Sequence, residues 1–234
     1  MTETDRHPNG RRRHAVPGPT EKMREYLEVI YYLTARQEPV ISARLAEWMH
    51  VTPPTVTVIV RRLEESGYIQ RDTRGEIRLT DDGWVLAEAM VKRHRILERF
   101  LVDIMGVPWH MIHEEAVRLE HALSPLLESR IEALVSGSTT CPHGNPIPGS
   151  GAGYQGTMRL SDAEQSSSFT VLRIVEEAEE DTELMEYLQT NDLVPGARFE
   201  VASNSASYGV TLRHGRQTIT VPPQIAGQLW GQPG

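Results

Sequence analysis

Five potential metal-binding side chains lie between residues 94 and 121 of this chain: His94, Glu98, His113, Glu120 and His121, interleaved with apolar residues at helical spacing. His94 and Glu98 are four residues apart, so a helix would project both from one face. Glu120 and His121 would close a second helix that passes beside the first. Two helices would thus present one cluster of imidazoles and carboxylates.

Imidazole and carboxylate ligands together suit a divalent transition metal: manganese, ferrous iron, cobalt or zinc. Any one of these residues, taken alone, is more simply interpreted as a solvated charge or a hydrogen-bonded core histidine. The set favours a metal site because the neighbouring Ile96, Leu97 and Leu123 indicate a packed helix pair. Charges beside such a core need partners.

The composition predicts a globular protein with more than one domain, because the chain has 234 residues and 39% of them are hydrophobic. No apolar run approaches the length of about 18 residues that a membrane span needs. The single cysteine excludes an internal disulfide and favours a reducing, cytoplasmic location. Residues 1–19 lack a hydrophobic signal core and are predicted to be a disordered basic tail.

The net charge of −8 is unevenly distributed. Residues 1–80 carry 13 Lys and Arg against 11 Asp and Glu, a balance of +2, whereas residues 81–234 carry 11 against 21, a balance of −10. Any phosphate-binding surface is therefore expected in the first third of the chain.

Residues 20–80 are predicted to form three short helices and a hairpin. Ser42 and Thr52 are suitable N-caps for the second and third helices, and Pro53 suits the first position of the third. A hairpin with a basic tip is predicted at residues 68–79. This pattern is typical of a winged helix-turn-helix, which places its recognition helix in the major groove of DNA. A small helical bundle that binds only protein is the alternative, and the arginines on the hairpin weigh against it.

The predicted DNA contacts lie on the second helix, the third helix and the hairpin. Arginines and hydroxyls mostly position such a module on phosphates, whereas the first turn of the recognition helix reads bases. That turn offers mainly apolar contact, which suits thymine methyl groups. The predicted set is Arg44, Thr52, Pro53, Pro54, Thr55, Thr57, Val58, Arg61, Arg62, Arg71 and Arg74.

The run VTPPTVTVIVRRLEESGYI, followed by LTDDGWVLAEAMVKRHRILERFLVDIMGV, IHEEAVRLEHALS and CPHGNPIPG, resembles the diphtheria toxin repressor family of metal-dependent transcription repressors, which sense iron or manganese. The match spans roughly residues 20–150. The resemblance implies a mainly α fold with small β parts: an N-terminal winged helix-turn-helix, a helical dimerisation domain and, in long members, a C-terminal SH3-like domain. It also implies a homodimer.

The resemblance further implies two metal sites. The ancillary site would combine His94, Glu98 and His113 with residues of the C-terminal domain nearest Glu180 and Glu183. The primary site would combine Glu25 with Glu120 and His121, and Glu28 matches a further carboxylate of short manganese sensors. Val117 departs from the family, which usually places cysteine or a carboxylate there. Only its backbone carbonyl could bind a metal.

Cys141 and His143 supply another candidate site. In manganese-sensing members of the streptococcal type, a CPHG sequence provides a thiol and an imidazole beside the carboxylate that resembles Glu98. The two residues are two apart in a loop, a spacing that permits joint ligation. If this site forms, it competes with His94 and His113 for Glu98. A lone cysteine in a Pro/Gly loop is more often inert.

A primary site of oxygens and one nitrogen favours Mn(II), with Fe(II) close behind, and Zn(II) or Co(II) could occupy it in vitro. The predicted division is a tail at 1–19, a DNA-binding domain at 20–80, a helical metal-binding and dimerisation domain at 81–135, a Gly/Pro-rich linker at 136–156, and an SH3-like (FeoA-like) domain at 157–234. In the last domain, strands are predicted at 169–174, 199–202, 208–212 and 218–221, with a helix around 184–188.

The predicted function is a repressor that binds palindromic operator DNA as a dimer when loaded with metal, and so controls metal homeostasis genes. Without metal, Glu25 and Glu28 would repel Glu98 and Glu120 and loosen the junction between head and dimer core. Neither catalytic residues, nor a small-molecule substrate, nor a membrane partner is predicted.

Three alternatives remain open: a carboxylate-bridged metal enzyme, a metal-independent winged-helix regulator and a metal buffer. The enzyme would need a pair of Glu-x-x-His repeats, whereas the one such repeat, from Glu47 to His50, lies in the head.

Overall fold

The computed structural model describes residues 18–234, so almost all of the predicted basic tail lies outside the described residues. The N-terminal head contains α1 (Glu21–Ala35), α2 (Ser42–Trp48) and α3 (Pro53–Glu65), followed by the hairpin strands β1 (Ile69–Arg71) and β2 (Ile77–Leu79). The strands pair in antiparallel register, with Ile69 opposite Leu79. The predicted winged helix-turn-helix is therefore present.

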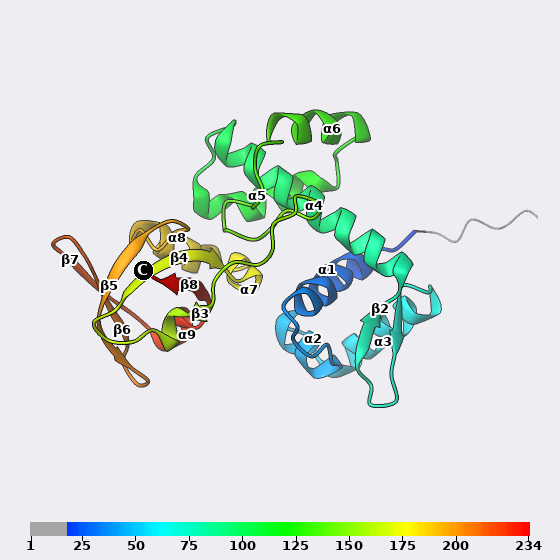
Figure 1. Cartoon of the computed structure of the whole chain (residues 1–234). Coiled ribbons are helices and arrows are strands. Elements are labelled where there is room, and N and C mark those ends of the chain that lie inside the picture. The colour runs from blue at the N-terminus through cyan, green and yellow to red at the C-terminus, as the bar shows by residue number, and fades with distance from the viewer. Residues whose placement is uncertain (1–17) are drawn as a thin grey trace, which may run out of the picture.

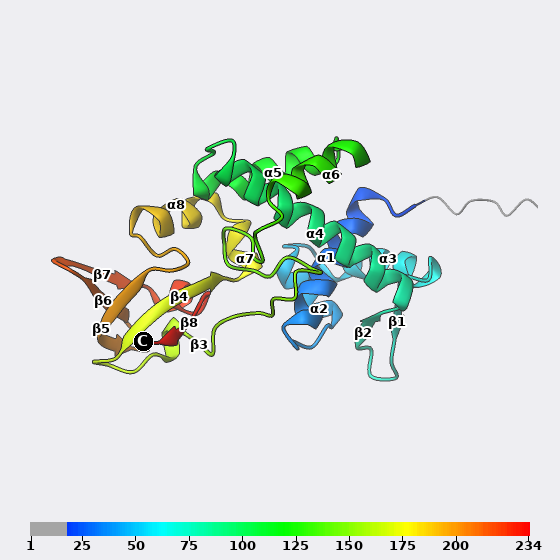
Figure 2. The ribbon, with the colours of Figure 1, turned by 45° about the horizontal axis from the view of Figure 1, so that its top comes forward.

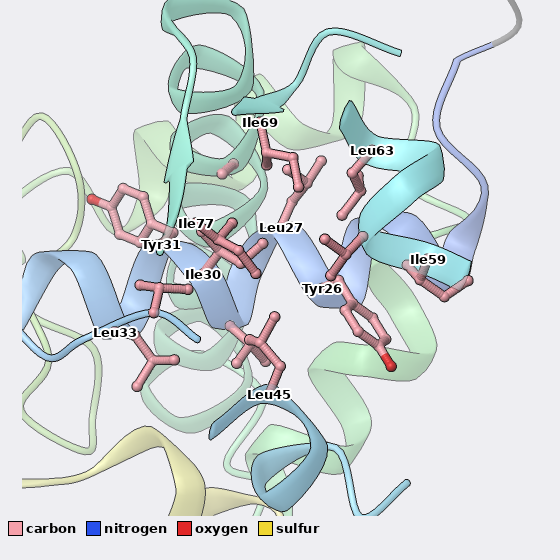
Figure 3. Close-up of a cluster of buried hydrophobic side chains, with 14 of the residues drawn as sticks. Tyr26, Leu27, Ile30, Tyr31, Leu33, Leu45, Ile59, Leu63, Ile69 and Ile77 are labelled. Carbon is pink, nitrogen blue, oxygen red and sulfur yellow. The ribbon is translucent and has the colours of Figure 1, made fainter. Parts of the chain in front are cut away.

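The core of the head forms around α1, whose apolar residues recur at helical spacing. Tyr26, Leu27 and Ile30 are fully buried and pack against Leu45 of α2 and Leu63 of α3, as Figure 3 shows. Burial of side chains of this size contributes roughly 1.5–3 kcal/mol each. This core holds α3 against the hairpin.

One local prediction in the head was wrong. The N-cap of α2 is Ile41 rather than Ser42, which is the first helical residue. The helix buries Trp48 beside Leu45, while Ala46 and Met49 are only half-buried, because the large indole stacks on Tyr32 of α1 at a ring distance of 6.0 Å. Thr52 does occupy the N-cap of α3, but its hydroxyl faces the Thr55 hydroxyl at 3.1 Å instead of capping the backbone.

The long helix α4 (Asp81–Asp103) connects the head to the rest of the molecule (Figure 1). Its N-cap, Thr80, accepts a hydrogen bond from the backbone N–H of Gly83 at 3.1 Å. Gly83 has to be glycine, because a Cβ there would lie 1.8 Å from the carbonyl oxygen of Tyr68. Beyond α4 come η1 (Trp109–Met111), α5 (Ile112–Glu120) and α6 (Pro125–Leu134), and α4 packs on α5 around Leu97, Leu101 and Ile112.

The C-terminal part is a six-stranded antiparallel sheet in the order β3-β8-β4-β5-β6-β7. Its strands are β3 (Met158–Arg159), β4 (Ser168–Ile174), β5 (Arg198–Ser205), β6 (Gly209–His214), β7 (Gln217–Val221) and β8 (Leu229–Pro233). The short segments η2 (Leu160–Asp162), α7 (Glu176–Glu179), α8 (Thr182–Thr190) and α9 (Pro223–Ala226) complete it. The four predicted strands and the predicted helix all occur, although β6 starts one residue after Tyr208. The predicted fold class is thus confirmed.

Helix α7 lies between the C-terminal sheet and the head in both views (Figures 1 and 2). Arg36, the C-cap of α1, binds Glu176 of α7 at 3.2 Å, and Arg44 of α2 binds Glu177 at 2.5 Å. One short helix therefore joins the first and last parts of the chain. Among the described helices, none is both long and apolar enough to cross a membrane.

Candidate metal centre

The cluster predicted from α4 and α5 is assembled in the structure. His94 and Glu98 project from one face of α4, and His113 projects toward them from the second position of α5. The Nε2 atom of His94 lies 3.2 Å from Oε1 of Glu98 and 3.1 Å from Nδ1 of His113. Glu98 is fully buried and His94 is nearly so. The spacing of four residues on a buried helix face thus produces the expected convergence.

The C-terminal part adds Glu179, which had not been predicted. Its Oε2 atom lies 3.5 Å from Nδ1 of His113, and the donor atoms of His94, Glu98, His113 and Glu179 all lie within 4.8 Å of one another. Glu180 and Glu183 were predicted for this role and do not join that group. Glu180 lines a neighbouring cavity, and Glu183 is exposed at a hollow beside α2.

The orientation of the single turn of α7 determines which of its carboxylates faces the cluster. Glu176 and Glu179 are three apart, so both lie on the inner face of α7, where they are 4% and 6% exposed. In a run with carboxylates at 176, 177, 179, 180, 181 and 183, the pattern of apolar residues gives no signal for which one faces inward.

Cys141 and His143 lie against the other side of the same cluster. The Nδ1 atom of His143 is 3.3 Å from Oε1 of Glu98 and 3.4 Å from Oε1 of Glu179. Ligand atoms of Glu98, Cys141 and His143 form a second group within 4.8 Å. The segment predicted to be a linker is not free here, since residues 141–148 are all buried.

Contacts within the cluster shift the pKa values of its histidines and carboxylates in opposite directions. Burial acts to lower the pKa of His94, but the Glu98 and Glu120 carboxylates hold it well above its usual value. Burial acts to raise the pKa of Glu98, but His143 and His94 hold it well below its usual range. A metal ion binds the neutral imidazole, so a raised pKa makes binding of an ion at His94 compete with binding of a proton.

The residues fit a divalent metal ion. Nδ1 of His94 faces Oε2 of Glu120 at 3.2 Å, so a ring that donates from Nδ1 to Glu120 would present the lone pair of Nε2 to an ion beside Glu98 and His113. Carboxylate support of this kind is typical of metal-bound histidines. Two imidazoles and two carboxylates suit Mn(II), Fe(II), Co(II) or Zn(II).

The predicted primary-site residues surround a cavity of about 300 Å³ between α1 and α5. Glu25, Glu28, Glu120 and His121 all line it, and the Val117 side chain forms part of its apolar wall. They are not drawn into a compact group: Glu25 binds Lys22 at 2.5 Å, and Nε2 of His121 lies 3.4 Å from Oε1 of Glu21. This cavity adjoins the first cluster through His94 and Glu120.

Glu28 is expected to make the stability of the folded protein depend on pH. Burial, reinforced by Glu120, raises its pKa to about 8. The folded metal-free protein therefore holds a proton that the unfolded chain releases near pH 4.5, and stability falls as the pH rises from about 4.5 to about 8. We expect Glu28→Gln to remove up to about 1.4 kcal/mol per pH unit from this slope. Urea unfolding of both proteins at pH 5 and pH 8 measures it, and parallel losses of stability would contradict the prediction.

The predicted DNA-contacting residues lie mainly on the outer face of α3 and on the hairpin. Thr52, Pro53, Pro54, Thr55, Thr57, Val58, Arg61, Arg62, Arg71 and Arg74 are all exposed. Some make ion pairs: Arg71 binds Glu64 at 2.5 Å and Arg61 lies 3.7 Å from Glu65. Arg44 is the exception, because it is half-buried and bound to Glu177 of α7 rather than presented beside α3.

A winged helix-turn-helix joined by one long helix to a buried cluster of histidines and carboxylates defines a DNA-binding protein with a metal centre. Family models match three consecutive parts of the chain: "Iron dependent repressor, N-terminal DNA binding domain" at 19–75, "Iron dependent repressor, metal binding and dimerisation domain" at 80–149, and "FeoA domain" at 158–233. The chain belongs to the iron-dependent repressor family.

Individual relatives agree with this assignment. The chain is 33% identical over 212 residues to the iron-dependent repressor IdeR of Mycobacterium leprae, covering 86% of this chain and 92% of that protein. It is 30% identical over 211 residues to the diphtheria toxin repressor of Corynebacterium diphtheriae, with the same coverage. A solved manganese-dependent transcriptional repressor in complex with manganese is 32% identical, with a TM-score of 0.75 over 89% of this chain and 98% of that one.

Proposed function

We propose that this protein is a transcriptional repressor that binds operator DNA as a homodimer when its centre holds Mn(II) or Fe(II), and so regulates metal homeostasis genes. The observation that carries the proposal is the position of the cluster. Its donors come from α4, α5 and α7, and the adjoining cavity is lined by Glu25 and Glu28 of α1 in the head. An ion bound there would tie the orientation of the head to the rest of the chain.

The proposed switch acts through the junction rather than through the DNA-contacting residues. Glu28 and Glu120 both line the cavity, and the Glu120 charge adds to the burial that raises the pKa of Glu28. A divalent ion would offset these charges and favour one arrangement of head and dimer core. Two heads held in this way would present their α3 helices about one helical turn, roughly 34 Å, apart on a palindromic site.

A homodimer is supported by apolar residues that are exposed on α6 and directly after α4. Leu126, Leu127 and Leu134 on α6 are 67%, 53% and 61% exposed, and Ile104 and Met105 after α4 are 52% and 61% exposed. Apolar side chains gathered on neighbouring elements mark an interaction surface. A second copy of the chain is the partner proposed for this face.

The residues proposed to contact DNA are those on α3 and the hairpin, with Arg44 as a phosphate contact only if it leaves Glu177. Manganese is the proposed lead metal and iron the close second. A protein that represses transcription works where the DNA is, so a cytoplasmic location is part of the proposal. A regulator is favoured over a metal enzyme by family membership, and oxygen consumption by the loaded protein would reverse that preference.

The test is a DNA-binding titration with and without metal. Duplex DNA selected from a random pool by the metal-loaded protein is bound by metal-stripped and Mn(II)- or Fe(II)-loaded protein in parallel. Tighter binding by the loaded protein is expected. Equal affinity of the two forms would overturn the proposal.

Arg62 on the exposed face of α3 provides a separate prediction about the DNA surface. We expect Arg62→Ala to weaken binding of all duplexes similarly and to reduce the slope of log affinity against log salt by about 1, because a phosphate contact carries no sequence information. Fluorescence anisotropy at several salt concentrations measures this, with Arg198→Ala on the distant strand β5 as the control. A change in sequence preference would show instead that Arg62 reads a base.

A further inference from the structure

Arg44 of the head pairs with a carboxylate of the C-terminal part. It lies in the first turn of α2, the first helix of the helix-turn-helix, and such a helix crosses the sugar–phosphate backbone of bound DNA. In the structure its Nη2 atom lies 2.5 Å from Oε1 of Glu177 on α7. A carboxylate therefore takes the partner that a DNA phosphate could otherwise bind.

The guanidinium of Arg44 can exchange one anion for another without any change in the core of the head. Its side chain is 25% exposed and lies over the ring of Trp48 at 5.6 Å. The head itself offers it only longer contacts, to Glu38 at 3.5 Å and to Glu47 at 3.1 Å. Since water reaches the guanidinium, exchange of Glu177 for a phosphate needs the movement of a single side chain.

Helix α7 is anchored independently of Arg44. Glu176 binds Arg36 at 3.2 Å and Arg95 at 2.8 Å, and Oε2 of Glu177 itself lies 3.2 Å from Arg36. These contacts remain when Arg44 leaves. The helix therefore keeps Glu177 beside α2 whether or not DNA is bound.

A hollow of about 770 Å³ lies between α2 and the turn from α7 to α8. Among the described residues that line it, Arg44 is the only arginine or lysine, whereas Glu47 of the head and four carboxylates of the C-terminal part carry negative charge. Those of the C-terminal part are Glu177, Glu180, Asp181 and Glu183. Gathered carboxylates produce a potential of the same sign as that of a DNA strand. The C-terminal part thus binds Arg44 and also repels DNA that approaches it.

We propose that Glu177 competes with a DNA phosphate for Arg44, so that the C-terminal part restrains DNA binding by the head. The inference rests on the proposed function, because it concerns how strongly the same head binds operator DNA. Binding of DNA replaces the ion pair between Arg44 and Glu177 with one between Arg44 and a phosphate. Removal of the Glu177 charge makes Arg44 available before the DNA arrives.

Fluorescence anisotropy of the full chain with a mixed-sequence duplex tests the restraint, because phosphate contacts do not depend on sequence. Partly exposed ion pairs are weak, so loss of one in each head of Glu177→Gln should tighten binding by the dimer roughly 2- to 30-fold. The slope of log affinity against log salt should become steeper by about 1 for each head. Arg44→Ala should have little effect in the native protein and should remove the gain in the Glu177→Gln background.

Two controls separate the release of Arg44 from a change in net charge. Glu183→Gln neutralises a carboxylate that lines the same hollow and has no ion pair in the described part of the chain, so a smaller gain that survives Arg44→Ala is expected. Glu200→Gln neutralises a carboxylate on β5 that lies 3.5 Å from Arg213, and unchanged binding is expected. Weaker or unchanged binding by Glu177→Gln contradicts the proposal, and so does a gain that is the same when Arg44 is alanine.

The same titrations with and without Mn(II), on the duplex selected by the loaded protein, distinguish this inference from the proposed function. If loaded and stripped native proteins bind that duplex equally while Glu177→Gln still tightens binding through Arg44, the metal-dependent function fails and the restraint stands. If loading tightens binding but Glu177→Gln does not, the restraint fails and the metal-dependent function stands.

Discussion

Glu98→Gln is expected to abolish metal-dependent DNA binding while leaving the weak binding of the stripped protein unchanged. Glu98 is the one residue common to both donor groups, and its carboxylate lies among His94, His113 and His143. Glutamine has nearly the same shape but no charge and a poorer ligand oxygen. The substitution therefore removes a shared ligand with little change in volume.

The size of the effect follows from the free energy that a switch needs. Loss of a residue that merely supports a ligand costs roughly 10- to 100-fold in metal affinity, so loss of the ligand itself should exceed that range. An ion that moves a conformational equilibrium from 1:99 to 99:1 must bind one form about 10⁴-fold more tightly than the other. A hundredfold loss would take away about half of that driving free energy.

Calorimetric titration with Mn(II) and anisotropy titration with duplex DNA measure the two effects on the same sample. Glu186→Gln, on the exposed side of α8, makes the same chemical change outside the centre and is the matched control. Circular dichroism of the stripped proteins checks that the variant folds. Native-like metal affinity in Glu98→Gln would show that neither donor group binds the ion that controls DNA binding.

The ligands on the long helix could be predicted because helical spacing directly determines which side chains share a face. His94 and Glu98 follow that rule, and the apolar residues between them identify the buried side of α4. Val56, Ile59, Val60 and Leu63 of α3 also recur at helical spacing, and all four are buried. Regular apolar periodicity in a long helix thus predicts which face of the helix is buried.

The ligand from α7 could not be predicted in this way. A helix of one turn has too few residues for a periodicity, so nothing in the sequence distinguishes Glu179 from Glu180. The orientation of α7 is decided by tertiary contacts: Asn145 donates to Oε1 of Glu179 at 2.8 Å and Arg95 donates to Glu176 at 2.8 Å. Strands β3 and β8 were also missed, because their short segments acquire their order by pairing with β4 and with each other.

The same contacts lead to an expected stability effect at Glu176. This carboxylate is 4% exposed and binds two guanidinium groups that are themselves buried, Arg36 at 3.2 Å and Arg95 at 2.8 Å. Tyr154 also donates to it at 3.0 Å. Removing it would leave the buried Arg95 without a carboxylate partner, whereas Arg36 keeps Glu38 and Glu177. Breaking a buried ion pair by removing one partner costs about 3–5 kcal/mol.

We therefore expect Glu176→Gln to lower the midpoint of thermal unfolding by roughly 6–20 °C, since 1 kcal/mol corresponds to about 2–4 °C in a chain of this size. Glu177→Gln is the matched control on the same helix. Glu177 pairs with Arg36 and Arg44, but it is 26% exposed, and Arg44 keeps Glu38 and Glu47 as partners. Water and these neighbours compensate for its loss, so a shift of a few degrees at most is expected.

Scanning calorimetry of the metal-stripped proteins measures both shifts, and the order of the two variants is the decisive result. Because Arg36 belongs to the head and Arg95 to α4, Glu176 joins three parts of the chain through a single carboxylate. Its loss should also make the head more accessible to limited proteolysis near residues 36–41. If Glu177→Gln is the more destabilising variant, or if the two are equal, the attachment of the head depends on the exposed arginine pair and not on the buried network around Glu176.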